Sequence, residues 1–340
     1  MQRFKNILVL YQGRIGDEET LDHAITLARD NGAALTLATA LKLPVGPARA
    51  ILSPSSPDVR RHYACLIDER LRHLQRLAAG IRPGNFPIHC KALAGRPNEE
   101  VIRVIRRDRI DLTMMTADYE TVLGAIAFGS LSIQLMRNAP CPVWVFRPGR
   151  DGEAGSVLAT VDPAGPDVAP SPLDIHILNV AAALARRRNG HLDILHAWEL
   201  KGADLQTSRS EITDEITERL LCRGSSACAR ALAQLCTAVD LDGLETEIHL
   251  PRGAAPAEIA RFASCRPVDI IVMGVARTGF AASLFGNTAE DVLQRVSASV
   301  LTVKQSILAH TMESVGDTRS RQAPPICRTH SVIRSRSTNS

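Results

Sequence analysis

The sequence predicts an α/β protein of two tandem doubly wound domains, each with a five-stranded parallel sheet flanked by helices. Three observations predict this fold class. The 340 residues suffice for about two domains, the first half of the chain reappears in the second, and each half alternates short apolar runs with amphipathic segments. Because apolar strands separated by helices are buried on both faces, the pattern favours parallel sheets covered by helices on both sides.

The duplication holds nearly one register along the chain. Three pairs of positions lie 158 residues apart: Asn31-Gly32 with Asn189-Gly190, Gly95 with Gly253, and Asp111 with Asp269. Phe128-Gly129 then matches Phe285-Gly286 at 157 residues, so the second copy has lost one residue after its fourth strand. A constant offset over three segments indicates an internal repeat.

The first copy shows the elements most clearly. The apolar runs predict five strands, at 6–11, 33–41, 86–93, 111–116 and 142–146. Apolar residues recurring at i, i+3 and i+4 predict helices at 18–31, 58–79, 98–107 and 130–137.

Domain boundaries follow from composition. We expect domains at 1–147 and 157–305, joined by a polar linker at 148–156 that is rich in Gly and carries Pro148. The remaining residues, 306–340, are rich in Ser, Thr, Arg and Pro and lack apolar periodicity, which predicts a disordered tail.

Charge and hydropathy narrow the function classes. The net charge of +4 is mild, and basic and acidic residues are interspersed, so nucleic-acid binding is not expected. In "EEVIRVIRRDR", Glu99 and Arg103 stand four apart and predict a solvated helix face with an i,i+4 ion pair. The N-terminal apolar run is too short for a signal segment or a membrane span, so we expect a cytoplasmic protein with no membrane partner.

The eight cysteines predict neither disulfides nor a metal site. They form no C-x-x-C pair, and the histidines do not bracket them at zinc-ligand spacing. We therefore interpret them as small buried apolar residues.

Residues that follow strands one and four are the candidates for ligand contact, because open parallel sheets bind ligands at the carboxyl ends of their strands. After strand one, Gln12 of the first copy corresponds to Asp162 of the second. A carboxylate at this point can accept hydrogen bonds from a ribose or an adenine amine. It can equally start a turn before Pro163, and residue type alone leaves both readings open.

After strand four the second copy reads "MGVARTGFAASLFGNTAE", from Met273 to Glu290. Glycines let backbone amides approach phosphate oxygens, and a following helix N-terminus adds donors. The alternative is that Asn287 caps the next helix, with Glu290 as its reciprocal partner.

These residues resemble those of the universal stress protein family, whose domains carry G-x-x-G, nine residues, then G-S or G-T. The resemblance covers both copies, "ILSP" and "PVWVF" included, and is specific to the tandem type. It implies an adenine-nucleotide α-hydrolase-like fold. It also implies an ATP site in the second copy at Asp162, Met273, Gly274, Arg277, Gly286, Asn287 and Thr288.

Both copies depart from the family pattern. The first has Thr116 and Tyr119 at the leading glycine positions, and Gln12 in place of the acid, so we expect no nucleotide there. The second has Arg277 in place of the second glycine and is one residue short before Gly286. Arg277 could instead offer a charged fork to a phosphate.

The chain lacks a P-loop, a G-x-G-x-x-G motif and a G-x-S-x-G elbow, so no catalytic machinery is predicted. The resemblance implies a non-catalytic stress-response protein that supports survival by binding protein or small-ligand partners. The alternatives are an ATP-binding protein with slow hydrolysis and a scaffold for an apolar ligand between the copies. We further expect the copies to pack through their apolar fifth strands as an internal pseudo-dimer.

Overall fold

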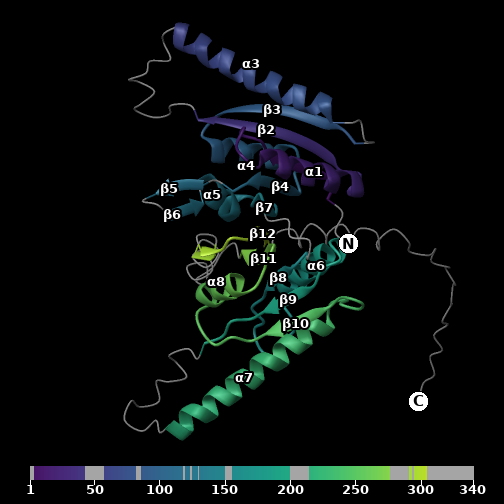
Figure 1. The fold of residues 1–340 in the computed structure, drawn as a ribbon, viewed down its shortest axis with the longest axis vertical. Coiled ribbons are helices and arrows are strands. Elements are labelled where there is room, and N and C mark those ends of the chain that lie inside the picture. Colours follow the sequence, from purple (N-terminus) through teal and green to yellow (C-terminus); the bar gives the residue numbers. More distant parts are fainter. Residues whose placement is uncertain are drawn as a thin grey trace, which may run out of the picture.

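The computed structural model describes residues 4–42, 57–81, 86–117, 119–122, 125–128, 130–149, 155–199, 214–275, 291–292 and 295–304. Figure 1 shows the strands lying between two long helices, α3 (Pro57–Gly80) and α7 (Asp214–Thr237), at opposite ends of the molecule. Among the helices in these ranges, none is both long enough and apolar enough to cross a membrane. The expected tail at 306–340 lies outside the described residues.

Ten strands form one sheet, in the order β10-β9-β8-β11-β12-β7-β4-β1-β2-β3. The first copy contributes β1 (Asn6–Leu10), β2 (Ala34–Lys42), β3 (Ile88–Gly95), β4 (Leu112–Thr116) and β7 (Val143–Phe146). The second contributes β8 (Val157–Thr160), β9 (Leu192–Leu195), β10 (Thr246–His249), β11 (Ile270–Val275) and β12 (Ser299–Lys304). Within the ten-stranded sheet, all pairings between strands of the same copy are parallel. The predicted fold class, two five-stranded parallel units, is therefore confirmed.

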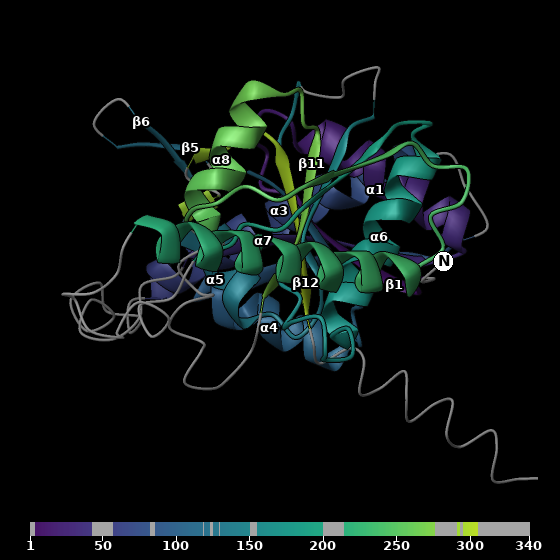
Figure 2. The same cartoon turned by 90° about the horizontal axis from the view of Figure 1, so that it is seen from below.

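Helices cover both faces of the sheet. In the first copy α1 (Asp17–Asn31) and α3 pack on one face, and α4 (Pro97–Arg107) and α5 (Ser130–Asn138) pack on the other. In the second copy α6 (Pro172–Arg187) and α7 share the face of α1, and α8 (Ala255–Cys265) lies on the face of α4. Figure 2 shows the molecule from below, with α7 nearest the viewer.

The hydrophobic core runs without interruption from one copy to the other. Strands β4, β7, β8 and β12 are buried at every position, as expected for central parallel strands. On the α1 face, Ile7 and Trp144 of the first copy belong to the same buried cluster as Leu301 and Val272 of the second. The opposite face has a second shared cluster. The copies therefore bury one another rather than forming separate cores.

The seam between the copies is the antiparallel pair β7–β12, with Trp144 opposite Leu301. The Thr302 hydroxyl donates to the Val143 carbonyl at 3.2 Å. The fully buried Lys304 ammonium donates to the carbonyls of Met136 and Arg137 at the C-terminus of α5, where a positive charge suits the helix dipole. The expectation that the copies pack through their fifth strands is confirmed.

Two features of the first copy depart from expectation. Between the strand expected at 111–116 and the helix expected at 130–137, where no element was predicted, β5 (Tyr119–Val122) and β6 (Ala125–Phe128) form an antiparallel hairpin. On α4 the predicted i,i+4 pair is replaced by i,i+3 pairs, because Arg103 reaches Glu100 and Glu99 is taken by Arg96.

The interpretation of the cysteines as buried apolar residues is wrong for three of them. Cys141 is buried, with its pKa raised to about 11 chiefly by that burial. Cys90, Cys228 and Cys236 are half-buried. The exposed ones are Cys65, Cys222 and Cys265. Cys65 and Cys222 lie on the long outer helices α3 and α7, and Cys265 is the last residue of α8. Because each of these helices packs on the sheet with one side only, a cysteine on its other side is exposed.

Candidate functional site

The carboxyl edge of the second copy carries a group of polar side chains. Asp162 follows β8 by two residues, and its side chain is 59% exposed. His196 follows β9 directly and is buried, with its Nδ1 3.8 Å from the Asp162 carboxylate. The same Nδ1 lies 3.1 Å from the Val161 carbonyl, and because a carbonyl only accepts, Nδ1 carries the hydrogen.

Helix α6 positions the second acid of this group. Ser171 caps the helix by accepting from the Leu173 amide, and Pro172 follows at the first helical position. This start places Asp174 in the first turn, where it is buried and accepts the backbone N–H of Asp162 at 3.1 Å. The group is therefore two carboxylates and an imidazole, held by the ends of two strands and the start of one helix.

Burial raises the pKa of Asp174 above its ordinary value. The hydrogen bond from the Asp162 amide opposes this shift, the negative charge of Asp162 adds to it, and His196 opposes it. A positive or hydrogen-donating ligand at this edge would offset the repulsion between the carboxylates.

We expect the free energy of unfolding to fall as pH rises through the pKa of Asp174. The folded carboxyl keeps its proton above the ordinary value of 3.8, where the unfolded one has released it. The stability that the protonated Asp174 contributes is fully present below pH 3.8 and is lost as pH rises through the raised pKa. Asp174→Asn should therefore gain stability relative to the parent with increasing pH, which urea unfolding between about pH 4 and 7 measures. Parallel pH profiles for the two proteins would contradict the assignment.

Gly274 lies in β11 and has a packing explanation. A Cβ at this position would stand 3.0 Å from Ile177 Cδ1 and 3.0 Å from Leu173 Cδ2, both on α6. The glycine thus allows α6 to lie close to the sheet. Met273 is buried in the cluster on the α8 face, so it is a core residue away from α6.

Four of the residues predicted for the site cannot be placed. Arg277, Gly286, Asn287 and Thr288 lie outside the described residues. Of the seven predicted positions, the structure brings Asp162 and Gly274 to the edge near the start of α6.

The corresponding edge of the first copy is closed by its own side chains. The buried Asp17 accepts the backbone N–H groups of Gln12 at 2.7 Å and of Arg14 at 2.9 Å. It also accepts the hydroxyl of Thr116, which lies 2.9 Å from the hydroxyl of Thr20.

The Gln12 side chain completes this closure. Its Oε1 accepts the Thr39 hydroxyl at 2.9 Å and the Ala40 amide at 3.1 Å. The polar groups of this edge are thereby partnered within the first copy.

Strand registers equate the two edges position by position. The Tyr11 amide donates to the Ala38 carbonyl in the first copy, and the Val161 amide donates to the Leu195 carbonyl in the second. The residues that follow these carbonyls, Thr39 and His196, therefore occupy equivalent positions. Met115 and Met273 likewise pair with Leu10 and Thr160, so Thr116 takes the place of Gly274. Where one copy has a threonine hydroxyl bonded to α1, the other has a glycine packed against α6.

Sequence reasoning missed Asp17, Asp174 and His196. The two aspartates stand at helix starts, where an acid is usual and draws no attention. His196 could have been found, since it directly follows the second strand of the second copy.

This geometry defines the class of protein: a tandem doubly wound α/β protein whose first copy closes its carboxyl edge with its own side chains and whose second copy carries an exposed carboxylate there. Residues 3–147 and 167–304 match the universal stress protein family, and the chain belongs to that family.

Two relatives match this chain over nearly their whole length. Universal stress protein E of Photorhabdus laumondii is 23% identical over 308 residues, 89% of this chain and 96% of that protein. Universal stress protein E of Escherichia coli K12 is 23% identical over 307 residues, 89% and 95% of the two chains.

Solved structures show the same fold. A functionally unknown protein from Pseudomonas aeruginosa PAO1 superposes with a TM-score of 0.64 at 21% identity, covering 93% of this chain and 98% of that one. A universal stress protein from Archaeoglobus fulgidus DSM 4304 gives 0.59 at 17% identity, covering 88% and 98%.

Proposed function

We propose that this protein acts in the stress response by binding rather than by catalysis, and that it engages a small ligand or a partner protein through the edge of its second copy. The observation that carries the proposal is the difference between the two edges. Asp17 and Gln12 satisfy the first edge internally, while the Asp162 carboxylate stands exposed beside His196. One copy supports the fold and the other faces a ligand.

The second candidate is narrower: the small ligand is an adenine nucleotide such as ATP. Solved universal stress proteins include one in complex with cAMP and one from Archaeoglobus fulgidus in complex with dAMP. For this chain the support comes from its own Asp162, an exposed acceptor two residues after β8, where a ribose or adenine amine can donate to it.

Calorimetry with magnesium-ATP tests the nucleotide candidate. We expect binding that weakens tenfold or more in Asp162→Ala, because a hydrogen bond to a charged group contributes about 1.5–3 kcal/mol. Gln12→Ala, at the matching position of the first copy, should leave binding unchanged. No heat at millimolar ATP retires the nucleotide candidate, and equal weakening in both variants contradicts the difference between the copies.

The choice of variant and an assay of ATP turnover complete this test. Gly274→Val is unsuitable as a probe, because the added side chain would meet Leu173 and Ile177 and disturb the packing of α6. Release of inorganic phosphate from ATP should stay at the buffer background. Turnover above that background, lost in Asp162→Ala, would overturn the non-catalytic proposal.

A further inference from the structure

Asp193 of the second copy is a fully buried carboxylate within a strand of the sheet. It lies in β9 and faces α8, because its neighbours Leu192 and Ile194 belong to the core of the opposite face. In the first copy Leu35 pairs with Ile7, and in the second copy Leu192 pairs with Val157 at the equivalent position. The residue after Leu35, Thr36, therefore corresponds to Asp193. A buried carboxylate is costly unless it is partnered, so its presence in one copy alone calls for a reason.

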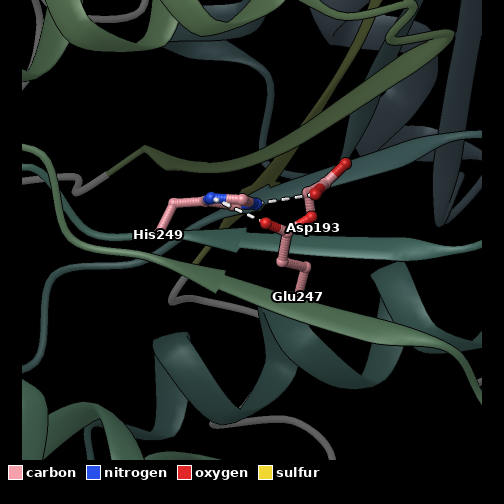
Figure 3. A group of neighbouring side chains, drawn as sticks. All are labelled: Asp193, Glu247 and His249. Carbon is pink, nitrogen blue, oxygen red and sulfur yellow. Dashed lines mark hydrogen bonds and ion pairs between the residues drawn. The ribbon is translucent and has the colours of Figure 1, made fainter.

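The partners of Asp193 converge on it from β10 and from the start of β9. Glu247 and His249 stand two residues apart on β10, so their side chains point to the same side of the sheet, as Figure 3 shows. His249 Nε2 lies 2.7 Å from Asp193 Oδ1, and His249 Nδ1 lies 3.9 Å from Glu247 Oε1. One ligand atom from each of these three residues lies within 4.8 Å of the other two.

His191 holds the other side of the carboxylate. Its Nε2 stands 3.1 Å from Asp193 Oδ2 and 3.2 Å from the Ser156 hydroxyl. A hydrogen bond of this kind fixes the orientation of a ligating carboxylate and leaves its other oxygen directed at the ligand.

Arg266 supplies the positive charge of the cluster. Its guanidinium lies 3.3 Å from Asp193 Oδ1 and 2.6 Å from Glu247 Oε2, and it lowers the pKa of Glu247 by hydrogen bonding. The Arg266 and Glu247 side chains are 42% and 57% exposed, whereas Asp193 and His249 are 0% and 15% exposed. Exposed ion pairs contribute little stability, so the arginine can leave while Asp193 and His249 stay in place.

The first copy has different residues at the equivalent positions. Strand register equates His249 with Lys91, and Arg266 matches Asp108 because they are the C-cap residues of α8 and α4. Lys91 and Asp108 form an ion pair. At the three ligand positions the first copy has Thr36, His89 and Lys91, which supply one usual metal ligand where the second copy supplies three.

We propose that Asp193, Glu247 and His249 form a binding site for a divalent transition-metal ion of the zinc type, with Arg266 as the cation that the metal displaces. One imidazole nitrogen and two carboxylate oxygens, completed by water, form a ligand set that zinc accepts. In a tetrahedron with bonds of about 2.0–2.1 Å the ligand atoms stand roughly 3.3 Å apart. The His249–Asp193 contact must therefore open slightly when the metal enters. The site lies on the α8 face and is independent of the proposed ligand edge.

Zinc titration of chelator-treated, tag-free protein, followed by calorimetry, tests the site. We expect one equivalent of zinc to bind, with affinity reduced tenfold or more in His249→Gln and in Glu247→Gln. Glu247 is exposed, so its variant folds even if changes at the buried residues do not. Asp108→Asn, at the place of Arg266 in the first copy, is the matched control and should bind zinc as the parent does.

Arg266→Gln separates a built site from casual zinc binding by thiols. Since the metal and the guanidinium compete, its removal should tighten zinc binding by up to about fivefold, the value of one exposed ion pair. Weaker binding in this variant, zinc affinity unchanged by His249→Gln and Glu247→Gln, or no binding at all would overturn the proposal.

Discussion

Trp144→Ala is expected to lower the free energy of unfolding by about 3–5 kcal/mol, the usual cost of removing a large buried aromatic side chain. Trp144 is 6% exposed and lies in β7, directly opposite Leu301 of β12. It packs in the cluster that contains Ile7 of the first copy and Val272 of the second. Both copies should therefore lose stability together, in one transition.

The chain offers an internal reporter for this experiment. Its two tryptophans are Trp144 and Trp198, so the variant keeps only Trp198, a buried residue of the second copy. In urea unfolding, Trp198 fluorescence and circular dichroism should give the same, lowered midpoint. The exposed Ile15→Ala is the control and should unfold as the parent does. A Trp198 transition that stays at the parental midpoint would show that the copies unfold independently.

Asp17→Ala should destabilise the protein by about 2–4 kcal/mol, because it leaves several buried donors without an acceptor. Those donors are the backbone amides of Gln12 and Arg14 and the hydroxyl of Thr116. The matched variant is Asp174→Ala, which removes an acceptor of the Asp162 amide and also a carboxylate whose pKa burial raises. Its cost should stay within about 1 kcal/mol at neutral pH.

Thermal or urea unfolding of these two variants compares the copies directly. If Asp17→Ala and Asp174→Ala cost the same, the first edge is not more tightly closed than the second. The difference between the copies would then lose its energetic support.

Much of the fold was predictable because the repeat constrains it. The offset of 158 between Gly95 and Gly253 indicated two equivalent units, and alternating apolar runs identified the five strands of the first copy. The apolar character of "PVWVF" predicted a covered edge, and β12 covers it. The hairpin β5–β6 was not anticipated, because the segment was interpreted through its similarity to a glycine-rich loop.

The site was less predictable because its meaning depends on contacts between distant segments. Gly274 was interpreted as part of a phosphate cradle, yet the space beside it is taken by Leu173 and Ile177. The cluster around Asp193 joins residues 56 positions apart, which no local spacing rule detects. The Asp162 position was found because the repeat aligned it with Gln12, and its role, like those of Arg277 and Thr288, remains a prediction.

Hydrogen exchange measured by mass spectrometry, with and without saturating magnesium-ATP, tests most directly the claim that the copies have divided their roles. We expect slower exchange with nucleotide in peptides from 155–199, which contain Asp162, Asp174 and His196. Peptides from 4–42, which contain Asp17 and Gln12, should exchange at the same rate in both conditions. Protection of the first copy would contradict the claim, and protection of neither copy would retire the nucleotide as the ligand.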